Sequence, residues 1–228
     1  MTNLFSVFDP ASSVQNYSNW MSSTFVLLLI PSSLWILKNR ISQMNSLITN
    51  TLFQEMKILL SAISPTGGTI MFLSILIFIV FNNFLGLFPY IFTSTSHLIC
   101  SLSLSLPFWL SFMIFGWLKS YNHMLAHLVP QSTPGPLMMF MVIIETVSNI
   151  IRPLTLAVRL SANMIAGHLL MTLLGNQTAS AYNLTLALLL LTQVILLTLE
   201  SAVAIIQSYV FAVLSSLYSS ESTYSYDN

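Results

Sequence analysis

Apolar residues in this chain gather in long continuous runs and do not alternate with polar ones. A run of about 20 apolar residues can cross the hydrocarbon core of a bilayer as a helix, whose backbone satisfies its own hydrogen bonds. The strands of an outer-membrane barrel would alternate in short segments. Spanning helices are therefore predicted over residues 20–37, 70–88 and 98–118.

Residues 41–63 have a different pattern, in which apolar side chains recur among polar ones at helical spacing. The apolar positions are Ile41, Met44, Leu47, Ile48, Leu52, Met56 and Leu59. This spacing is typical of an amphipathic helix, which lies in the membrane interface and does not cross it. The sequence SPTGG, residues 64–68, then ends the helix.

The last part of the chain contains two unusually long apolar stretches, residues 137–174 and 180–218. At about 1.5 Å per residue, either stretch would form a helix nearly 60 Å long, roughly twice the hydrocarbon thickness. The two arms must tilt, curve or break, and they predict an oblique hairpin. The pattern as a whole predicts one membrane domain, an all-α polytopic membrane protein of about six helices: three spanning helices, one amphipathic surface helix and a long, steeply tilted C-terminal helical hairpin.

Composition supports a membrane protein and excludes several functions. The 228 residues are 55% hydrophobic and 5% charged, with a formal net charge of zero, whereas soluble domains are roughly 25% charged. Without a basic block, nucleic acid is not an expected partner. Cys100 is the only cysteine, so no internal disulfide can form. The first residues lack the basic and apolar regions of a secretory signal.

The few basic residues are unevenly distributed between the predicted loops. The connection at residues 89–97 holds no Lys or Arg. The opposite side, if the flanking segments both cross, carries Lys38, Arg40, Lys57 and Lys119. The positive-inside rule makes that side the inside. The N-terminus and the turn at residues 175–180 are then predicted outside, and the C-terminus inside.

Polar side chains interrupt both arms of the apolar hairpin. They are Glu145, Asn149, Arg152, Arg159, Asn163 and His168 on the first arm, and Gln193, Glu200 and Gln207 on the second. Steps of seven place Glu145, Arg152 and Arg159 on about one helical face. An arginine stays charged, and at mid-membrane depth it costs at least about 2.5–3.5 kcal/mol. We therefore expect Arg159 to have a function.

The ionisable groups of the hairpin are also distributed by depth. Glu145 lies near the inner end, Arg159 lies further in, and His168 lies toward the outer turn. Glu200 is expected in the same outer region, and Glu221 returns to the inner side. Carboxylates and imidazoles at stepped depths are what a proton path needs, because each can gain and lose a proton. A static Glu–Arg pair is the alternative interpretation.

No metal, cofactor or catalytic site is predicted. HMLAH provides an i, i+4 pair, His123 and His127, but no third ligand is apparent, and these residues and His97 are interpreted as interfacial loop residues. No segment has the pattern of a phosphate-binding loop, so no nucleotide site is expected.

Several motifs together resemble subunit a of F-type ATP synthases in its mitochondrial form. They are LAVRLSANMIAGHLL (156–170) preceded by IETVSNIIRP (144–153), LESAVAIIQSYVFAVLSSLYSSE (199–221), NNFLGLFPY and HLVPQSTP. His168 and Glu200 occupy positions where bacterial members tend to carry Glu and His. The resemblance runs along nearly the whole chain.

The resemblance implies a proton-translocating stator subunit beside a rotating ring of c subunits, loaded and unloaded through two offset half-channels. The family's essential arginine corresponds to Arg159, which separates the half-channels and meets the ring carboxylate. The other residues implied in the path are Asn163 and Gln207 near the arginine, His168 and Glu200 in the outer half-channel, and Glu145 and Glu221 in the inner half-channel. Arg152 is assigned no proton-transfer role.

The same resemblance implies the binding partners of the chain and its location in the cell. Expected partners are the c-ring, other Fo stator and peripheral-stalk subunits, and lipids. The expected location is the mitochondrial inner membrane, with the N-terminus toward the intermembrane space and the C-terminus toward the matrix. Two alternatives are a secondary transporter with its own midplane ion site, which often shows internal repeats, and a purely structural membrane subunit.

One geometric question concerns the register of the hairpin. Counting back from a turn near residue 177 places Arg159 level with about residue 195. Close approach of Arg159 to Gln207 therefore requires a break, a curve or an offset in the second arm.

Overall fold

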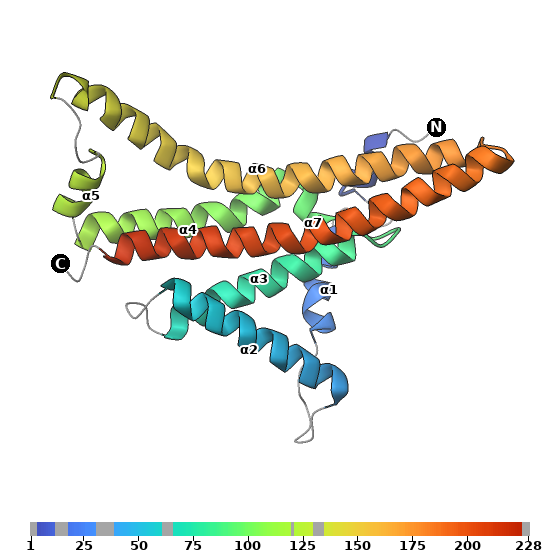
Figure 1. The fold of residues 1–228 in the computed structure, drawn as a ribbon, viewed down its shortest axis with the longest axis horizontal. Helices are drawn as coiled ribbons and strands as arrows, with labels where there is room; N and C mark the ends of the chain where they lie inside the picture. Colours follow the sequence, from blue (N-terminus) through green and yellow to red (C-terminus); the bar gives the residue numbers. More distant parts are fainter. Residues whose placement is uncertain are drawn as a thin grey trace.

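The fold was determined as a computed structural model, which describes residues 4–11, 18–30, 39–60, 66–119, 121–129 and 135–224. These residues form seven α-helices and short 3-10 helices, with no strand among them. Figure 1 shows the arrangement. The predicted all-α polytopic architecture is confirmed.

The helices follow the predicted apolar segments closely. The α-helices are α1 (Ser22–Leu29), α2 (Arg40–Leu60), α3 (Thr66–Gly86), α4 (Leu98–Lys119), α5 (Tyr121–His127), α6 (Met138–Thr178) and α7 (Asn183–Tyr224). The 3-10 helices are η1 (Leu4–Phe8), η2 (Ser18–Met21), η4 (Ser94–Ser96) and η5 (Gly135–Leu137).

Among the described residues, four helices, α3, α4, α6 and α7, are long and apolar enough to cross a membrane. The first predicted span, residues 20–37, is represented by α1, and its second half lies outside the described residues. The short helix α5 was not predicted, because seven residues rich in His and Asn give little periodicity.

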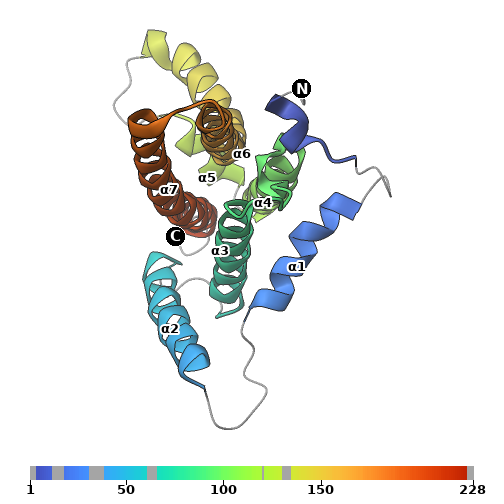
Figure 2. The ribbon, with the colours of Figure 1, turned by 90° about the vertical axis from the view of Figure 1, so that its right-hand side faces the viewer.

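Helix α7 lies at the centre of the bundle, where it contacts α2, α3, α4 and α6. Figure 2, an end-on view, shows α3, α4, α6 and α7 grouped together, with α1 and α2 further out. Small buried side chains permit this close packing, as is usual between membrane helices. On α6 they are Ala157 and Ser161, and on α7 they are Ala204, Ser208, Ala212, Ser215, Ser216 and Ser219.

Two apolar clusters hold α7 in place. Ile79 of α3 and Phe211 of α7 pack with Leu156 and Leu160 of α6. On the other side of α7, Ala212 packs with Met56 of α2 and Leu76 of α3. The first half of α2 leaves Ile41, Met44, Leu47 and Ile48 exposed, and its position at a membrane surface stays a prediction.

Hydroxyl groups on the helices mostly bond to their own helix. Ser208 Oγ donates to the carbonyl oxygen of Ile205 at 2.7 Å, and Ser216 Oγ donates to that of Val213 at 2.8 Å. A bond between distant segments is made by Asn83, whose buried Nδ2 donates to the carbonyl oxygen of Ala204 at 3.5 Å. This bond ties α3 to α7.

Candidate functional site

The predicted site residues lie on the hairpin formed by α6 and α7, which run antiparallel. In Figure 1 the turn between them, residues 179–182, lies at one end of the molecule and the C-terminus at the other. We call these the hairpin end and the C-terminal end. His168 and Glu200 lie toward the hairpin end, and Glu145 lies toward the C-terminal end.

The register of the two arms follows from residues that meet across them. A Cβ added to Gly167 would meet the Glu200 carboxyl group, and Arg152 lies over the Tyr218 ring. Interpolation between these two contacts places Arg159 within about one helical turn of Gln207 along the hairpin.

In this register α6 and α7 are offset along the hairpin, as close approach of Arg159 to Gln207 requires. Straight pairing from a turn near residue 177 is wrong, because α6 continues to Thr178 and α7 begins at Asn183. Both arms also bend along their length (Figure 1). The result brings Arg159 and Gln207 to similar depth.

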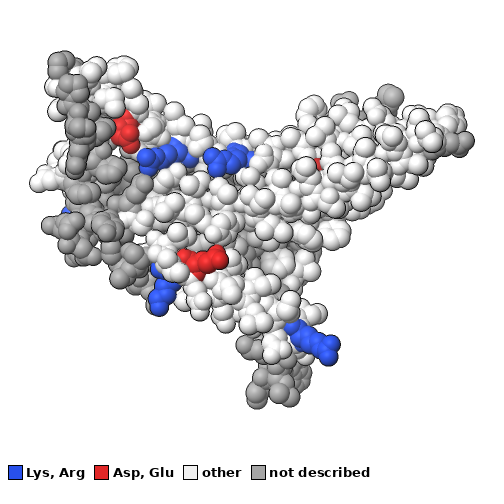
Figure 3. Space-filling view, viewed as in Figure 1, with Lys and Arg blue, Asp and Glu red and all other residues white. Residues whose placement is uncertain are grey.

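Arg159 faces away from the bundle. Its side chain is exposed, whereas its neighbours Leu160 and Ser161 are buried. Asn163, one turn further along, is also exposed and shares this face. Within the described residues, Arg159 makes no ion pair. Figure 3 shows how few charged side chains the viewed surface carries. The guanidinium is therefore available to an acidic group from outside the chain.

Toward the C-terminal end, Glu145 and Arg152 form an ion pair. Arg152 Nη2 lies 3.6 Å from Glu145 Oε1, and the side chains are 31% and 28% exposed. The Arg152 guanidinium carbon lies 5.4 Å from the centre of the Tyr218 ring on α7, within the range of a cation–π contact. The heptad spacing predicted that Glu145 and Arg152 share a face, and they do. The partner of the pair is Arg152 and not Arg159.

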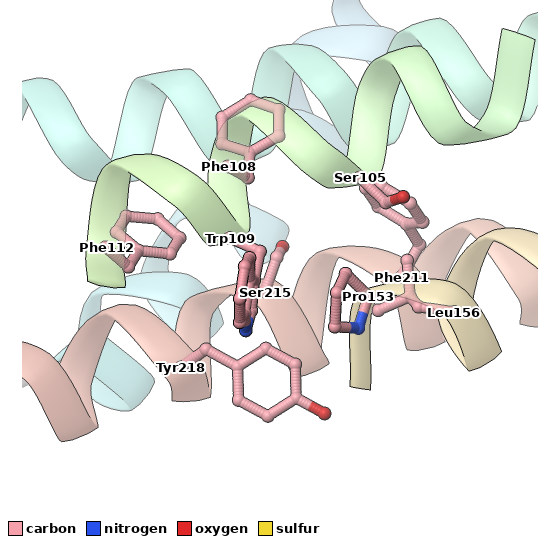
Figure 4. Close-up of a pocket in the computed structure, with 9 residues that line it drawn as sticks. All are labelled: Ser105, Phe108, Trp109, Phe112, Pro153, Leu156, Phe211, Ser215 and Tyr218. Carbon is pink, nitrogen blue, oxygen red and sulfur yellow. The ribbon is translucent and has the colours of Figure 1, made fainter. Parts of the chain in front are cut away.

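Pro153 follows Arg152 inside α6, where it removes one helical hydrogen bond. Beside it lies a cavity of about 20 Å³ between α4, α6 and α7. Figure 4 shows this cavity, whose lining residues are Ser105, Phe108, Trp109, Phe112, Pro153, Leu156, Phe211, Ser215 and Tyr218. The lining is almost entirely apolar, so we assign it no part in proton movement.

Toward the hairpin end, Glu200 lies against Gly167, the residue before His168. A Cβ added to Gly167 would lie 2.6 Å from Glu200 Oε1 and 2.8 Å from Glu200 Cδ. A side chain at position 167 would therefore displace the Glu200 carboxyl group from its present place. Glu200 Oε1 and His168 Nε2 are both buried and have no hydrogen-bond partner among the described residues. Buried polar atoms in this condition are uncommon in folded proteins.

A second buried polar group lies at the end of α3 and was not predicted. Its members are Asn82, Asn83, Thr93, Ser94, Thr95 and Ser96. Ser94 Oγ donates to Asn82 Oδ1 at 3.4 Å, and η4 also contacts α6. The signal in the sequence was the Asn-Asn pair inside an apolar span, since amides there require partners.

The structure describes the remaining predicted residues only in part. Gln207 is half-buried. Glu221 lies within α7, but its side chain is outside the described residues, as are the side chains of His123 and His127. The ring of His97 stacks on Phe92 at 5.1 Å between ring centres and also contacts Trp20. Gly167, Phe8 and Tyr218, which touch the predicted residues, were missed.

Comparison with known proteins agrees with the resemblance seen in the motifs. Residues 18–220 match the family model described as ATP synthase A chain. ATP synthase subunit a of Anopheles quadrimaculatus is 62% identical over 223 residues, covering 97% of this chain and 99% of that protein. The Aedes aegypti protein of the same name has the same identity and coverage.

The similarity extends to other insects. ATP synthase subunit a of Drosophila melanogaster is 61% identical over 222 residues, covering 97% of this chain and 99% of that protein. An isolated charged arginine on a long apolar hairpin, a match over most of the chain and relatives at this identity lead to one conclusion. The chain belongs to the ATP synthase subunit a family.

Proposed function

We propose that this chain is the proton-translocating stator subunit of an ATP synthase Fo sector, with Arg159 separating two offset half-channels that load and unload carboxylates on a c-ring. The family supports the coarser part, a non-catalytic membrane subunit of an ATP synthase complex. It also removes the support for a secondary transporter. The finer assignments depend on the hairpin.

The exposed, unpaired Arg159 supports this proposal more than any other observation. Its own chain provides no acidic partner within the described residues, although Arg152 seven residues earlier has one. A permanent charge on an apolar face is costly unless an anion compensates it. A ring carboxylate that ionises on meeting Arg159 is such an anion, because a nearby opposite charge favours the charged form.

The two half-channels are supported by the axial positions of the other ionisable groups. His168 and Glu200 lie toward the hairpin end and Glu145 lies toward the C-terminal end, with Arg159 between them. A proton that reaches Arg159 from either end is repelled by its charge. We therefore assign His168 and Glu200 to the outer path, Glu145 and Glu221 to the inner path, and Asn163 and Gln207 to the region of Arg159.

Orientation in the membrane follows from the basic residues. Lys119 ends α4 at the C-terminal end, whereas residues 89–97 carry no Lys or Arg. By the positive-inside rule the hairpin end faces outside. We place the chain in the mitochondrial inner membrane with the N-terminus toward the intermembrane space, in contact with the c-ring, other Fo stator and peripheral-stalk subunits, and lipids.

The decisive experiment replaces Arg159. Arg159→Ala should lower ATP synthesis by about 100-fold or more, as when a preorganised electrostatic partner is removed from a reaction site. ATP synthesis is measured in inner-membrane vesicles, with assembly checked on native gels. The matched control is Arg152→Ala, which removes a cation that already has a partner and should lower synthesis far less. Normal synthesis by an assembled Arg159→Ala complex would refute the proposal.

A further inference from the structure

The N-terminal helix η1 lies against α6 beside His168. The Phe8 ring meets the His168 imidazole edge to face, with 6.4 Å between ring centres and 89° between ring planes. This separation and angle are in the favourable range for aromatic pairs. Phe8 is half-buried, whereas Leu4, Phe5, Ser6 and Val7 are exposed. The contact of η1 with the bundle is therefore centred on Phe8.

The segment around η1 is also attached at further points near the hairpin end. Asp9 Oδ1 accepts a hydrogen bond from the backbone N–H of Ala11 at 3.1 Å, which fixes the turn after Phe8. Asn19 Nδ2 donates to the carbonyl oxygen of Asp9 at 3.4 Å. Ser22 Oγ donates to the carbonyl oxygen of Phe92 at 3.0 Å. These bonds connect η1, through the start of α1, to the loop before η4.

Packing is important for the orientation of the His168 ring. Its Nε2 atom is buried without a hydrogen-bond partner among the described residues, as is Glu200 Oε1. No described hydrogen bond fixes the orientation of the imidazole, so ring packing is left to do so. The two ring nitrogens of a histidine are not equivalent, and ring orientation decides which one reaches a proton donor or acceptor.

We propose that η1 covers the His168 imidazole and that Phe8 is a positioning residue, which holds this ring in the orientation that proton transfer requires. The inference rests on the proposed role of His168 in the outer path. It adds that η1 is part of this path. Phe8 touches the imidazole but carries no proton.

The cover is tested by chemical modification of His168 in the assembled complex. Diethylpyrocarbonate reacts with unprotonated imidazole nitrogen, and mass spectrometry of the peptide gives the rate. Phe8→Ala should raise the rate at His168 about two- to tenfold, a range that follows from the usual strength of an aromatic pair. Phe8→Tyr, which keeps the ring, and Phe5→Ala, whose side chain is 67% exposed, should leave it unchanged.

The positioning role is tested by proton conduction through Fo after removal of the catalytic sector. Phe8→Ala should lower conduction by a similar factor, and Phe8→Tyr should restore it. Unchanged modification or unchanged conduction in Phe8→Ala overturns the inference, provided that His168→Gln lowers conduction. If His168→Gln conducts normally, the proposed role of His168 fails and the positioning role fails with it. The modification rates then still decide, separately, whether η1 covers the site.

Discussion

The two carboxyl groups of the hairpin lie in opposite surroundings. Toward the C-terminal end, Glu145 is partly exposed and paired with Arg152 at 3.6 Å. Toward the hairpin end, Glu200 has a buried oxygen without a hydrogen-bond partner among the described residues, and it lies against Gly167. In sequence both are single Glu residues in apolar runs. The difference shows that the neighbouring residues determine what each carboxyl group can do, Arg152 on the same helix for Glu145 and Gly167 on the other arm for Glu200.

A paired carboxylate and an unpaired one respond differently to change. Removing one member of the Glu145–Arg152 pair leaves a charge behind, although solvent access limits the cost. Removing Glu200 leaves no counter-charge behind within the described residues. Substitutions at the hairpin end are thus expected to affect proton movement directly, whereas those at the other end act through the pair.

The largest effect in this comparison is expected for Glu200→Gln. The amide cannot exchange a proton, so proton conduction through Fo should fall at least about tenfold, toward the roughly 100-fold typical of lost acid–base groups. The control is Ser201→Ala, because Ser201 Oγ donates within its own helix to the carbonyl oxygen of Thr198 at 2.7 Å. Unchanged conduction in Glu200→Gln would remove Glu200 from the outer path.

The next largest effect is expected for a substitution of Gly167, which lies against the Glu200 carboxyl group. Gly167→Ala places a Cβ against the Glu200 carboxyl group, which must shift away from its present position. Conduction should fall several-fold while the complex still assembles. Gly175→Ala is the matched control, because a Cβ there meets nothing within 4 Å.

Shortening the carboxylate should relieve the clash. The double variant Gly167→Ala, Glu200→Asp is expected to conduct better than Gly167→Ala alone. If the double variant is worse than either single one, the two residues do not compete for the same space.

A smaller effect is expected at the paired end. Glu145→Gln and Arg152→Gln should each lower ATP synthesis by a few-fold, and the double variant should do no worse than either. The expected coupling is about 0.2–1 kcal/mol, the range of partly exposed ion pairs, obtained from a double-mutant cycle on synthesis rates. Strict additivity would show that the contact between the two side chains is without functional consequence.

The smallest effect is expected for Tyr218→Leu. It removes the aromatic ring beside Arg152, worth about 0.5–1 kcal/mol at a partly exposed site. ATP synthesis should change about twofold or less, and Tyr218→Phe should behave as the parent does. Equal loss in both variants would assign the effect to the Tyr218 hydroxyl group and not to the ring.

Most of the helical architecture could be predicted from the sequence, since long apolar runs permit few alternatives in a membrane. The predicted spans 70–88 and 98–118 correspond to α3 and α4, and the hairpin arms correspond to α6 and α7. Heptad spacing also predicted the shared face of Glu145 and Arg152. These features depend on local periodicity, which a single sequence carries.

Contacts between distant segments could not be predicted in this way. The register of α6 against α7 depends on the position of the turn and on how each arm bends, neither of which periodicity determines. The contact of Phe8 with His168 joins residues 160 positions apart in the sequence, and nothing in LFSVF indicates it. Gly167 was open to interpretation, because a glycine inside a helical pattern commonly marks a close approach.

The bond from Asn83 to the carbonyl oxygen of Ala204 has a consequence for biogenesis. The two residues are 121 positions apart, so α3 is synthesised long before its partner on α7 exists. Until α7 arrives, the Asn83 amide needs another acceptor, such as water or a carbonyl oxygen of its own helix, as Asn82 Nδ2 uses that of Phe78 at 3.0 Å. The serine hydroxyls described near this contact on α7 bond within their own helix, so the carbonyl oxygen of Ala204 is left to accept from Asn83. The contact between α3 and α7 can therefore form only after α7 has been synthesised.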